Sequence, residues 1–190
     1  MYNLATKRFL QYSRTGNKSD PDEAIAYGAR SVESVPDNHR PHLPKRQNEL
    51  GNFVYERYRL LGNERDFRMA IKFCQEAFAF VVLDKHNPDA ITITQSYADK
   101  LAHQYEKTKN RDDLEFAITI AKSALALAPM GNVRRGCQNS VGALAAAPFC
   151  GETHLEKDLE YACTVLLEAW NTPNAFPLDY ARTAAQLLPL

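Results

Sequence analysis

A short motif occurs four times along this chain of 190 residues: an aspartate, an alanine four residues later, and an apolar residue directly after the alanine. The alanines stand 45 to 47 residues apart, and they are Ala24, Ala70, Ala117 and Ala162. A near-constant period of this length is typical of a stack of similar helical repeats, each of which buries its apolar side against its neighbours. The motif therefore predicts an all-α fold, and no other feature of the sequence constrains the architecture as strongly.

The residues that follow each alanine lie on one stripe of an α-helix. In the second repeat this stripe contains Ile71, Cys74, Ala77 and Phe78. Its small members allow another helix to approach closely, and its larger members fill the space beside that helix. We expect this to be the second helix of each repeat and to start at the motif aspartate, where a carboxylate meets free backbone N–H groups and the positive end of the helix dipole. These aspartates are Asp20, Asp66, Asp113 and Asp158.

A first helix is expected before each of these second helices. In the second repeat its stripe contains Leu50, Gly51 and Tyr58. The pair Gly62-Asn63 follows, and glycine or asparagine at such a place is typical of a helix end in the left-handed conformation. In the third repeat Lys109-Asn110 is a weaker version of the same ending.

Together these patterns predict a right-handed α-solenoid of about four helix-turn-helix repeats in a single domain, residues 1–190. The repeats are expected at about 1–40, 41–87, 88–132 and 133–174, followed by a terminal helix at 177–190. The first helix of the fourth repeat contains Gly136, Gly142 and Pro148, so we expect it to be shorter or kinked.

The charge balance lowers the expectation of a nucleic-acid partner. Lys and Arg together number 23, as do Asp and Glu, so the formal net charge is zero. Nucleic-acid-binding proteins usually carry an excess of basic residues. No apolar run approaches the roughly 20 residues that a membrane-spanning helix needs, and residues 1–11 show no apolar core of a secretory signal. Neither nucleic acid nor a membrane is therefore expected as a partner.

The cysteines indicate a reducing compartment. They are Cys74, Cys137, Cys150 and Cys163, and no pair has the short Cys-x-x-Cys spacing of a zinc or redox site. Cys74 and Cys163 fall among apolar neighbours in helical patterns, where buried free thiols are common. We therefore predict reduced cysteines and a cytoplasmic location. Because the chain has no glycine-rich phosphate loop, no cofactor is expected.

Several segments resemble the tetratricopeptide repeat. They are Leu50-Gly51-Asn52, Tyr55-Glu56-Arg57, Gly62-Asn63 and Asp113-Leu114-Glu115-Phe116-Ala117-Ile118. The period exceeds the usual ~34 residues of that repeat. The long period resembles the variant found in fungal proteins in which such repeats precede a caspase-like CHAT domain. That domain is missing from this sequence, so the catalytic cysteine and histidine of the family have no counterpart here.

The resemblance implies that the first helices line a concave groove. The residues it places there are Lys45, Asn48, Asn52, Tyr55, Arg59, Gln95, Asp99 and His103. Asn52 falls where such repeats place an asparagine that grips a peptide backbone or a terminal carboxylate, and Lys45 and Arg59 would complete an anion-binding face. Asp99 brings an acid into the same groove, so a two-asparagine carboxylate clamp is not supported. These residues either bind a ligand or only solvate the groove.

Other candidates for chemistry have ordinary explanations. His39 and His42 form His-x-x-His in a proline-rich turn, but further metal ligands are not spaced near them, so we predict no metal site. Asp99 and His103 lie four residues apart on one helix and form either a general base or, as we favour, a surface pair. The tyrosines at one position of the first helices are interpreted as packing with a polar tip, and they are Tyr12, Tyr58 and Tyr105.

Three function hypotheses remain open. The first is a non-catalytic protein-interaction module that holds an extended peptide or a partner helix in the groove. The second is an assembly element that forms a homodimer through the C-terminal region, or the amputated regulatory part of a CHAT-type effector. The third is a small enzyme on a helical scaffold that uses Tyr55, Arg59, Asp99 and His103; the first hypothesis, in which there is no catalytic residue, is favoured.

Overall fold

The computed structural model describes residues 4, 7, 20–36, 42–82, 84, 86–129, 131–146 and 156–171. Helices and turns make up this part of the chain, and it contains no strand. The helices are α2 (Asp20–Glu33), α3 (Leu43–Leu61), α4 (Glu64–Val81), α5 (Ala90–Thr108), α6 (Arg111–Leu127), α7 (Asn132–Ala146) and α8 (Glu156–Asn171). The prediction of an all-α repeat fold is confirmed, whereas most of residues 1–19, residues 37–41 and the segment 177–190, where a terminal helix is expected, lie outside the described residues.

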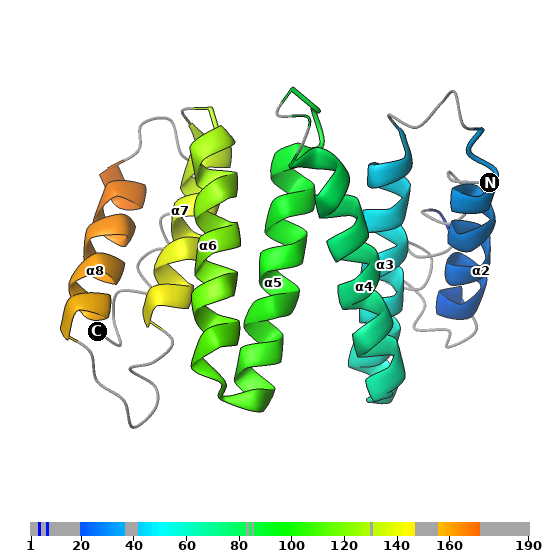
Figure 1. Cartoon of the computed structure of the whole chain (residues 1–190), viewed down its shortest axis with the longest axis horizontal. Coiled ribbons are helices and arrows are strands. Elements are labelled where there is room, and N and C mark those ends of the chain that lie inside the picture. The colour runs from blue at the N-terminus through cyan, green and yellow to red at the C-terminus, as the bar shows by residue number, and fades with distance from the viewer. Residues whose placement is uncertain are drawn as a thin grey trace. The chain divides into compact units, whose positions relative to one another are not determined.

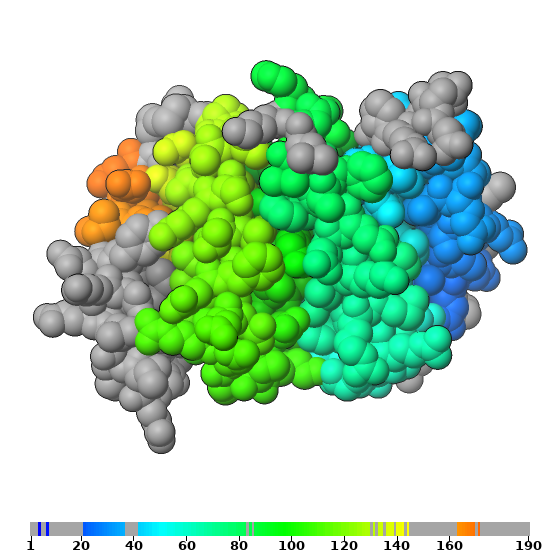
Figure 2. All heavy atoms as spheres, viewed as in Figure 1, coloured from blue at the N-terminus to red at the C-terminus, as the bar shows by residue number. Residues whose placement is uncertain are grey.

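Two compact units divide the chain: unit 1 is Met1–Tyr97 and unit 2 is Ala98–Leu190. The boundary falls within α5, whose residues 90–97 belong to unit 1. In unit 1, α3 packs against both α2 and α4, and α4 runs antiparallel to α3 (Figure 1). In unit 2, α7 packs against both α6 and α8. The side chains of α4 cover much of the face of unit 1 that is turned to the viewer in Figure 2.

The turns between α3 and α4 and between α5 and α6 have the same local conformation. Gly62 ends α3 in the left-handed conformation with φ 68°, and Lys109 follows α5 with φ 53°. Asparagine then caps the next helix, because the Asn63 side chain accepts a hydrogen bond from the backbone N–H of Arg65 at 3.0 Å. Asn110 caps α6 in the same way. The weaker Lys109-Asn110 ending therefore works like Gly62-Asn63.

The helix α2 begins at its motif aspartate, Asp20, as the sequence predicts, whereas the caps correct the expected role of two other motif aspartates. Asp66 is the third residue of α4 and Asp113 is the third residue of α6, so neither begins its helix. Asn63 and Asn110 fill the capping position instead. The side chain of Asp66 is only 4% exposed, so its charge requires a partner inside the fold.

The motif alanines lie in the core, as the sequence predicts. Ala24, Ala70 and Ala117 have no exposed surface. In unit 1, Ala70 joins Leu50 and Val54 in one buried cluster. The first helix of the fourth repeat, α7, has 15 residues against 19 in α3 and α5, which agrees with the expected shortening.

Glycine allows two pairs of helices to approach closely. A Cβ atom added to Gly51 of α3 would lie 2.8 Å from Cys74 Sγ and 3.2 Å from the Ala70 carbonyl oxygen. A Cβ atom added to Gly142 of α7 would lie 2.5 Å from Leu166 Cγ of α8. Real Cβ atoms do not reach such distances, so a larger residue at either position would force the two helices apart.

We expect Gly51→Ala to destabilise the protein. Overpacking of this kind costs about 1–3 kcal/mol, and better helix propensity recovers about 1 kcal/mol, so the free energy of unfolding should fall by up to about 2 kcal/mol. Chemical denaturation followed by circular dichroism measures the change. Adding Cys74→Ala should recover part of the loss, because the third repeat carries Ala98 and Ala121 at the corresponding positions.

The matched control is Gly28→Ala in α2. A Cβ atom there would lie 3.1 Å from Leu50 Cδ1, the far end of a flexible side chain that can turn aside. This variant should be close to neutral. Equal losses for Gly28→Ala and Gly51→Ala would contradict the argument from close backbone approach.

Candidate functional site

Two asparagines predicted to face the groove take part in contacts between helices of unit 1. Asn48 is 4% exposed, and its Oδ1 accepts a hydrogen bond from Cys74 Sγ of α4 at 3.7 Å. Asn52 is half-buried, and its Oδ1 accepts a hydrogen bond from Ser96 Oγ of α5 at 2.8 Å. The structure therefore places Asn48 in the interior and uses Asn52 to connect α3 with α5.

The two cations predicted for an anion-binding face each lie beside a carboxylate of the same unit. Lys45 Nζ lies 3.1 Å from Asp89 Oδ1, next to the start of α5. Arg59 Nη1 lies 3.1 Å from Glu56 Oε1 on the same helix, and the Arg59 side chain is 60% exposed. A ligand anion would have to displace these carboxylates, so the α3 face has charges of both signs rather than a positive field.

Tyr55 is half-buried and belongs to an aromatic cluster. Its ring centroid lies 6.0 Å from that of Tyr58 and 6.3 Å from that of Phe67. The rings of Tyr58 and Phe67 are 4.9 Å apart, so Tyr58 packs between α3 and α4. Gln95 is also half-buried, in the part of α5 that belongs to unit 1.

Asp99 and His103 belong to unit 2. His103 Nδ1 lies 3.1 Å from Glu106 Oε2, and the Glu106 side chain is 66% exposed. Asp99 is exposed by its surface area, although partial burial of its carboxyl group raises the pKa of that group above its ordinary value. A histidine beside an exposed carboxylate is held in a surface ion pair of small energetic value.

The remaining candidates contribute little to a site. His42 is exposed, and His39 and Tyr12 lie outside the described residues. In the part of the chain that the structure describes, no group of three or more His, Cys, Asp or Glu side chains is arranged to hold a metal ion. Lys109 Nζ lies 5.7 Å from the ring centroid of Tyr105, which gives this tyrosine an exposed cation–π contact.

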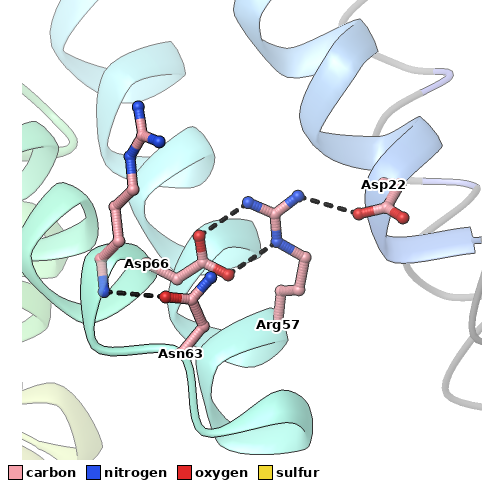
Figure 3. Close-up of polar contacts among 5 residues, drawn as sticks. Asp22, Arg57, Asn63 and Asp66 are labelled. Atoms are coloured by element: carbon pink, nitrogen blue, oxygen red, sulfur yellow. Dashed lines mark hydrogen bonds and ion pairs between the residues drawn. The ribbon is translucent and has the colours of Figure 1, made fainter.

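Sequence reasoning missed the strongest polar cluster, which Arg57 builds (Figure 3). Arg57 donates two hydrogen bonds to the Asp66 carboxylate, from Nε at 2.8 Å and from Nη2 at 2.7 Å. Its Nη1 donates a third, to Asp22 Oδ1 of α2 at 2.8 Å. One guanidinium therefore joins α2, α3 and α4. We call the contact between Arg57 and Asp66 the hairpin latch.

The third repeat has a contact at the position that corresponds to the hairpin latch. Gln104 Nε2 donates a hydrogen bond to Asp113 Oδ1 at 3.0 Å, and Thr108 Oγ1 donates to Asp113 Oδ2 at 2.8 Å. Both pairs are separated by nine residues along the chain. The aspartate of this contact recurs in the sequence and could be recognised as a motif. Its partner nine residues earlier is arginine in the second repeat and glutamine in the third, so the partner does not recur as one residue type.

The hydrogen bonds to Asp66 raise the pKa of the Arg57 guanidinium above its ordinary value. Arg57 therefore keeps its charge at every pH at which the protein would be studied, and the buried Asp66 carboxylate keeps a fixed counter-ion. Removing the arginine would leave a carboxylate in the interior without that partner.

We expect Arg57→Ala to lower the free energy of unfolding by about 3–5 kcal/mol, because breaking one side of a buried ion pair leaves a desolvated charge. Arg57→Gln should lose less, since Gln104 serves the same position in the third repeat. The control is Arg59→Gln, whose exposed pair with Glu56 should contribute less than about 1 kcal/mol. Urea denaturation at neutral pH measures all three, and an Arg57→Ala variant as stable as Arg59→Gln would contradict the role of the latch.

The described cysteines are not joined in disulfides. Cys74 and Cys137 are buried, and Cys163 is half-buried. Burial raises the pKa of the Cys137 thiol from 9.0 to about 11, although Arg134 acts in the opposite direction. Cys137 is therefore a neutral thiol at neutral pH, and a neutral thiol is a poor nucleophile.

Comparisons with known proteins support the fold and give no identity. No protein-family model matches the chain, and no curated protein matches it. Among solved structures the chain is similar to a DHF58 filament, with a TM-score of 0.55 and 16% identity over 99% of this chain and 94% of that one. It is also similar to the de novo designed helical repeat protein DHR64, with a TM-score of 0.45 and 16% identity over 97% and 93%.

At 16% identity the likeness to the first of these structures concerns the fold alone. Together with the repeated hairpins, it places the chain in the class of all-α helical repeat proteins. Among the described helices, none has both the length and the apolar character that crossing a membrane requires.

Proposed function

We propose that this chain is a non-catalytic protein-interaction scaffold and that the outer face of α3 binds an extended peptide or a partner helix. The observation that carries the proposal is a polar stripe along α3. Lys45, Asn52, Glu56 and Arg59 follow one another at helical spacing, so they share one face. The Lys45 side chain is 45% exposed and that of Arg59 is 60% exposed. We call this set the α3 stripe.

The chemistry of the α3 stripe fits a polar partner with charges of both signs. Its two cations sit beside carboxylates in partly exposed ion pairs, which exchange partners at little cost. The half-buried Tyr55 lies beside the stripe and adds an aromatic surface with a polar tip. The resemblance to tetratricopeptide repeats, including the long fungal variant, supports the same face, because first helices line the groove in that family. A cytoplasmic setting would agree with the free thiols.

Double charge reversal tests the proposal. Lys45→Glu combined with Arg59→Glu should reduce capture of partner proteins from an extract of the source organism at least about tenfold, because close like-charge contacts cost several kcal/mol. Immobilised protein and quantitative mass spectrometry give the measurement. Thermal unfolding should show that the variant stays folded.

The matched control carries the same changes away from the stripe. Lys72 of α4 pairs with Glu76, and Arg111 of α6 pairs with Glu115, so Lys72→Glu combined with Arg111→Glu also reverses two exposed, ion-paired cations. Partners that bind this control and the unchanged chain equally, but not the stripe variant, would support the proposal. Equal capture by all three proteins would refute it.

A second candidate function is self-assembly. Leu167 of α8 is 52% exposed, and Phe116 of α6 and Val133 of α7 are 47% and 48% exposed. Exposed large apolar side chains favour burial against a partner. The similar structure described as a filament makes a second copy of this chain a reasonable partner. The residues expected to end the chain in an apolar helix lie outside the described residues.

Light scattering over a dilution series tests this second function. Leu167→Glu should lower the average mass of any assembly, because a buried charge without a partner opposes association. Leu61→Glu in unit 1 is the control, since Leu61 is 60% exposed at the end of α3. A mass that neither dilution nor Leu167→Glu changes would exclude assembly through α8.

No observation favours the enzyme hypothesis. Tyr55 packs against other rings, whereas Arg59 and His103 are in local ion pairs. A catalytic base or nucleophile needs a neighbouring side chain that activates it for the reaction. The contacts of these three residues are instead typical of side chains that pack or pair on a protein surface.

A further inference from the structure

Four polar side chains from three helices form a continuous series of contacts inside unit 1. Cys74 Sγ lies 3.7 Å from Asn48 Oδ1 and 4.0 Å from Ser96 Oγ. Ser96 Oγ in turn donates a hydrogen bond to Asn52 Oδ1 at 2.8 Å. Asn48 and Cys74 are buried, whereas Asn52 and Ser96 are half-buried. We call this set the polar junction.

The polar junction lies where one repeat meets the next. Asn48 and Asn52 come from α3, Cys74 comes from α4, and Ser96 comes from the first half of α5. It therefore joins the α3–α4 hairpin of the second repeat to the first helix of the third repeat. Of its four residues, the functions proposed above use only Asn52, as a member of the α3 stripe.

Apolar packing alone does not distinguish one repeat from another. The second helices of the second and third repeats carry nearly the same stripe, for example Ala70-Ile71 and Ala117-Ile118. Because both stripes offer similar small and large side chains, a first helix from a second copy could pack on either one. Repeat proteins of this kind risk pairing in the wrong register or forming open-ended stacks.

The polar junction is where the repeats differ. At the position of Cys74 the other repeats carry Gly28, Ala121 and Leu166. One period before Ser96 the chain has Glu49, a longer and charged side chain that does not fit the same contact. A wrongly paired helix would remove the hydrogen bond to Asn52 and the contact of Ser96 with Cys74, and one such intramolecular hydrogen bond contributes about 0.5–1.5 kcal/mol.

We propose that the polar junction selects the helix that packs on the α3–α4 hairpin, so that the hairpin accepts α5, which carries Ser96, and rejects α3 of a second copy, which carries Glu49 at the same position. A single buried polar residue fixes register and oligomeric state in coiled coils for the same physical reason. Polar side chains at the junction bury less apolar surface than apolar ones would, and they disfavour association with a second copy.

The test replaces the polar groups by apolar groups of similar shape. Asn48→Leu, Asn52→Leu and Ser96→Ala are combined in one full-length variant, and Cys74 is kept because a buried thiol behaves as a small apolar group. Circular dichroism should show that the helical content is retained. Light scattering should show an average mass that rises with concentration at least about twofold above that of the unchanged chain at the same concentration.

The matched control adds leucines to the same hairpin without touching the junction. Gln47 Nε2 donates a hydrogen bond to Glu76 Oε2 at 3.2 Å, a contact between α3 and α4 within one repeat. Gln47→Leu combined with Glu76→Leu should therefore keep the mass of the unchanged chain. If this control associates as strongly as the junction variant, added apolar surface explains the result and the proposal fails.

A single substitution keeps the test decisive if the triple variant does not fold. Ser96→Ala removes the hydroxyl that lies between Cys74 and Asn52 and leaves only a small cavity. It should raise the average mass at the highest concentrations, by less than the triple variant. If every variant that folds keeps the mass of the unchanged chain throughout the dilution series, the polar junction does not control pairing.

Discussion

Close approach of helix backbones is the constraint on which this fold depends. Gly51 leaves no room for a side chain between α3 and Cys74, and Gly142 leaves none between α7 and Leu166. Fully buried alanines such as Ala70 and Ala117 line the stripes of the second helices. Because packing at this distance is sensitive to a single methyl group, the size of each residue in these columns fixes how the two helices of a hairpin meet.

Polar contacts between helices then stabilise the close packing that the small residues allow. Arg57 connects three helices through Asp66 and Asp22, and Gln104 and Asp113 repeat the central contact in unit 2. Polar side chains used in this way are unavailable for chemistry. Lys45 and Arg59 of the α3 stripe lie outside these contacts between helices, and the partner binding proposed above is assigned to their exposed side chains.

The candidate site could be predicted only in part. The resemblance to tetratricopeptide repeats assigned Lys45 and Arg59 to a groove, but it did not show that Asp89 and Glu56 lie beside them. The same resemblance assigned Asn48 to the groove, whereas this residue is buried and contacts Cys74 of α4. A periodicity gives the direction of a side chain around its own helix. It contains no information on which neighbouring helix lies in that direction.

By itself the sequence determined the all-α repeat architecture, the buried alanine columns and the left-handed hairpin endings, because each follows from residue size or backbone preference within one helix or turn. Only the tertiary structure decided the partners of Asp66, Asn48 and Asn52. Those partners lie on other helices, and Arg57 and Gln104 show that chemically different residues can fill one position. Contacts between helices depend on distances in space, which a repeating pattern along the chain does not contain.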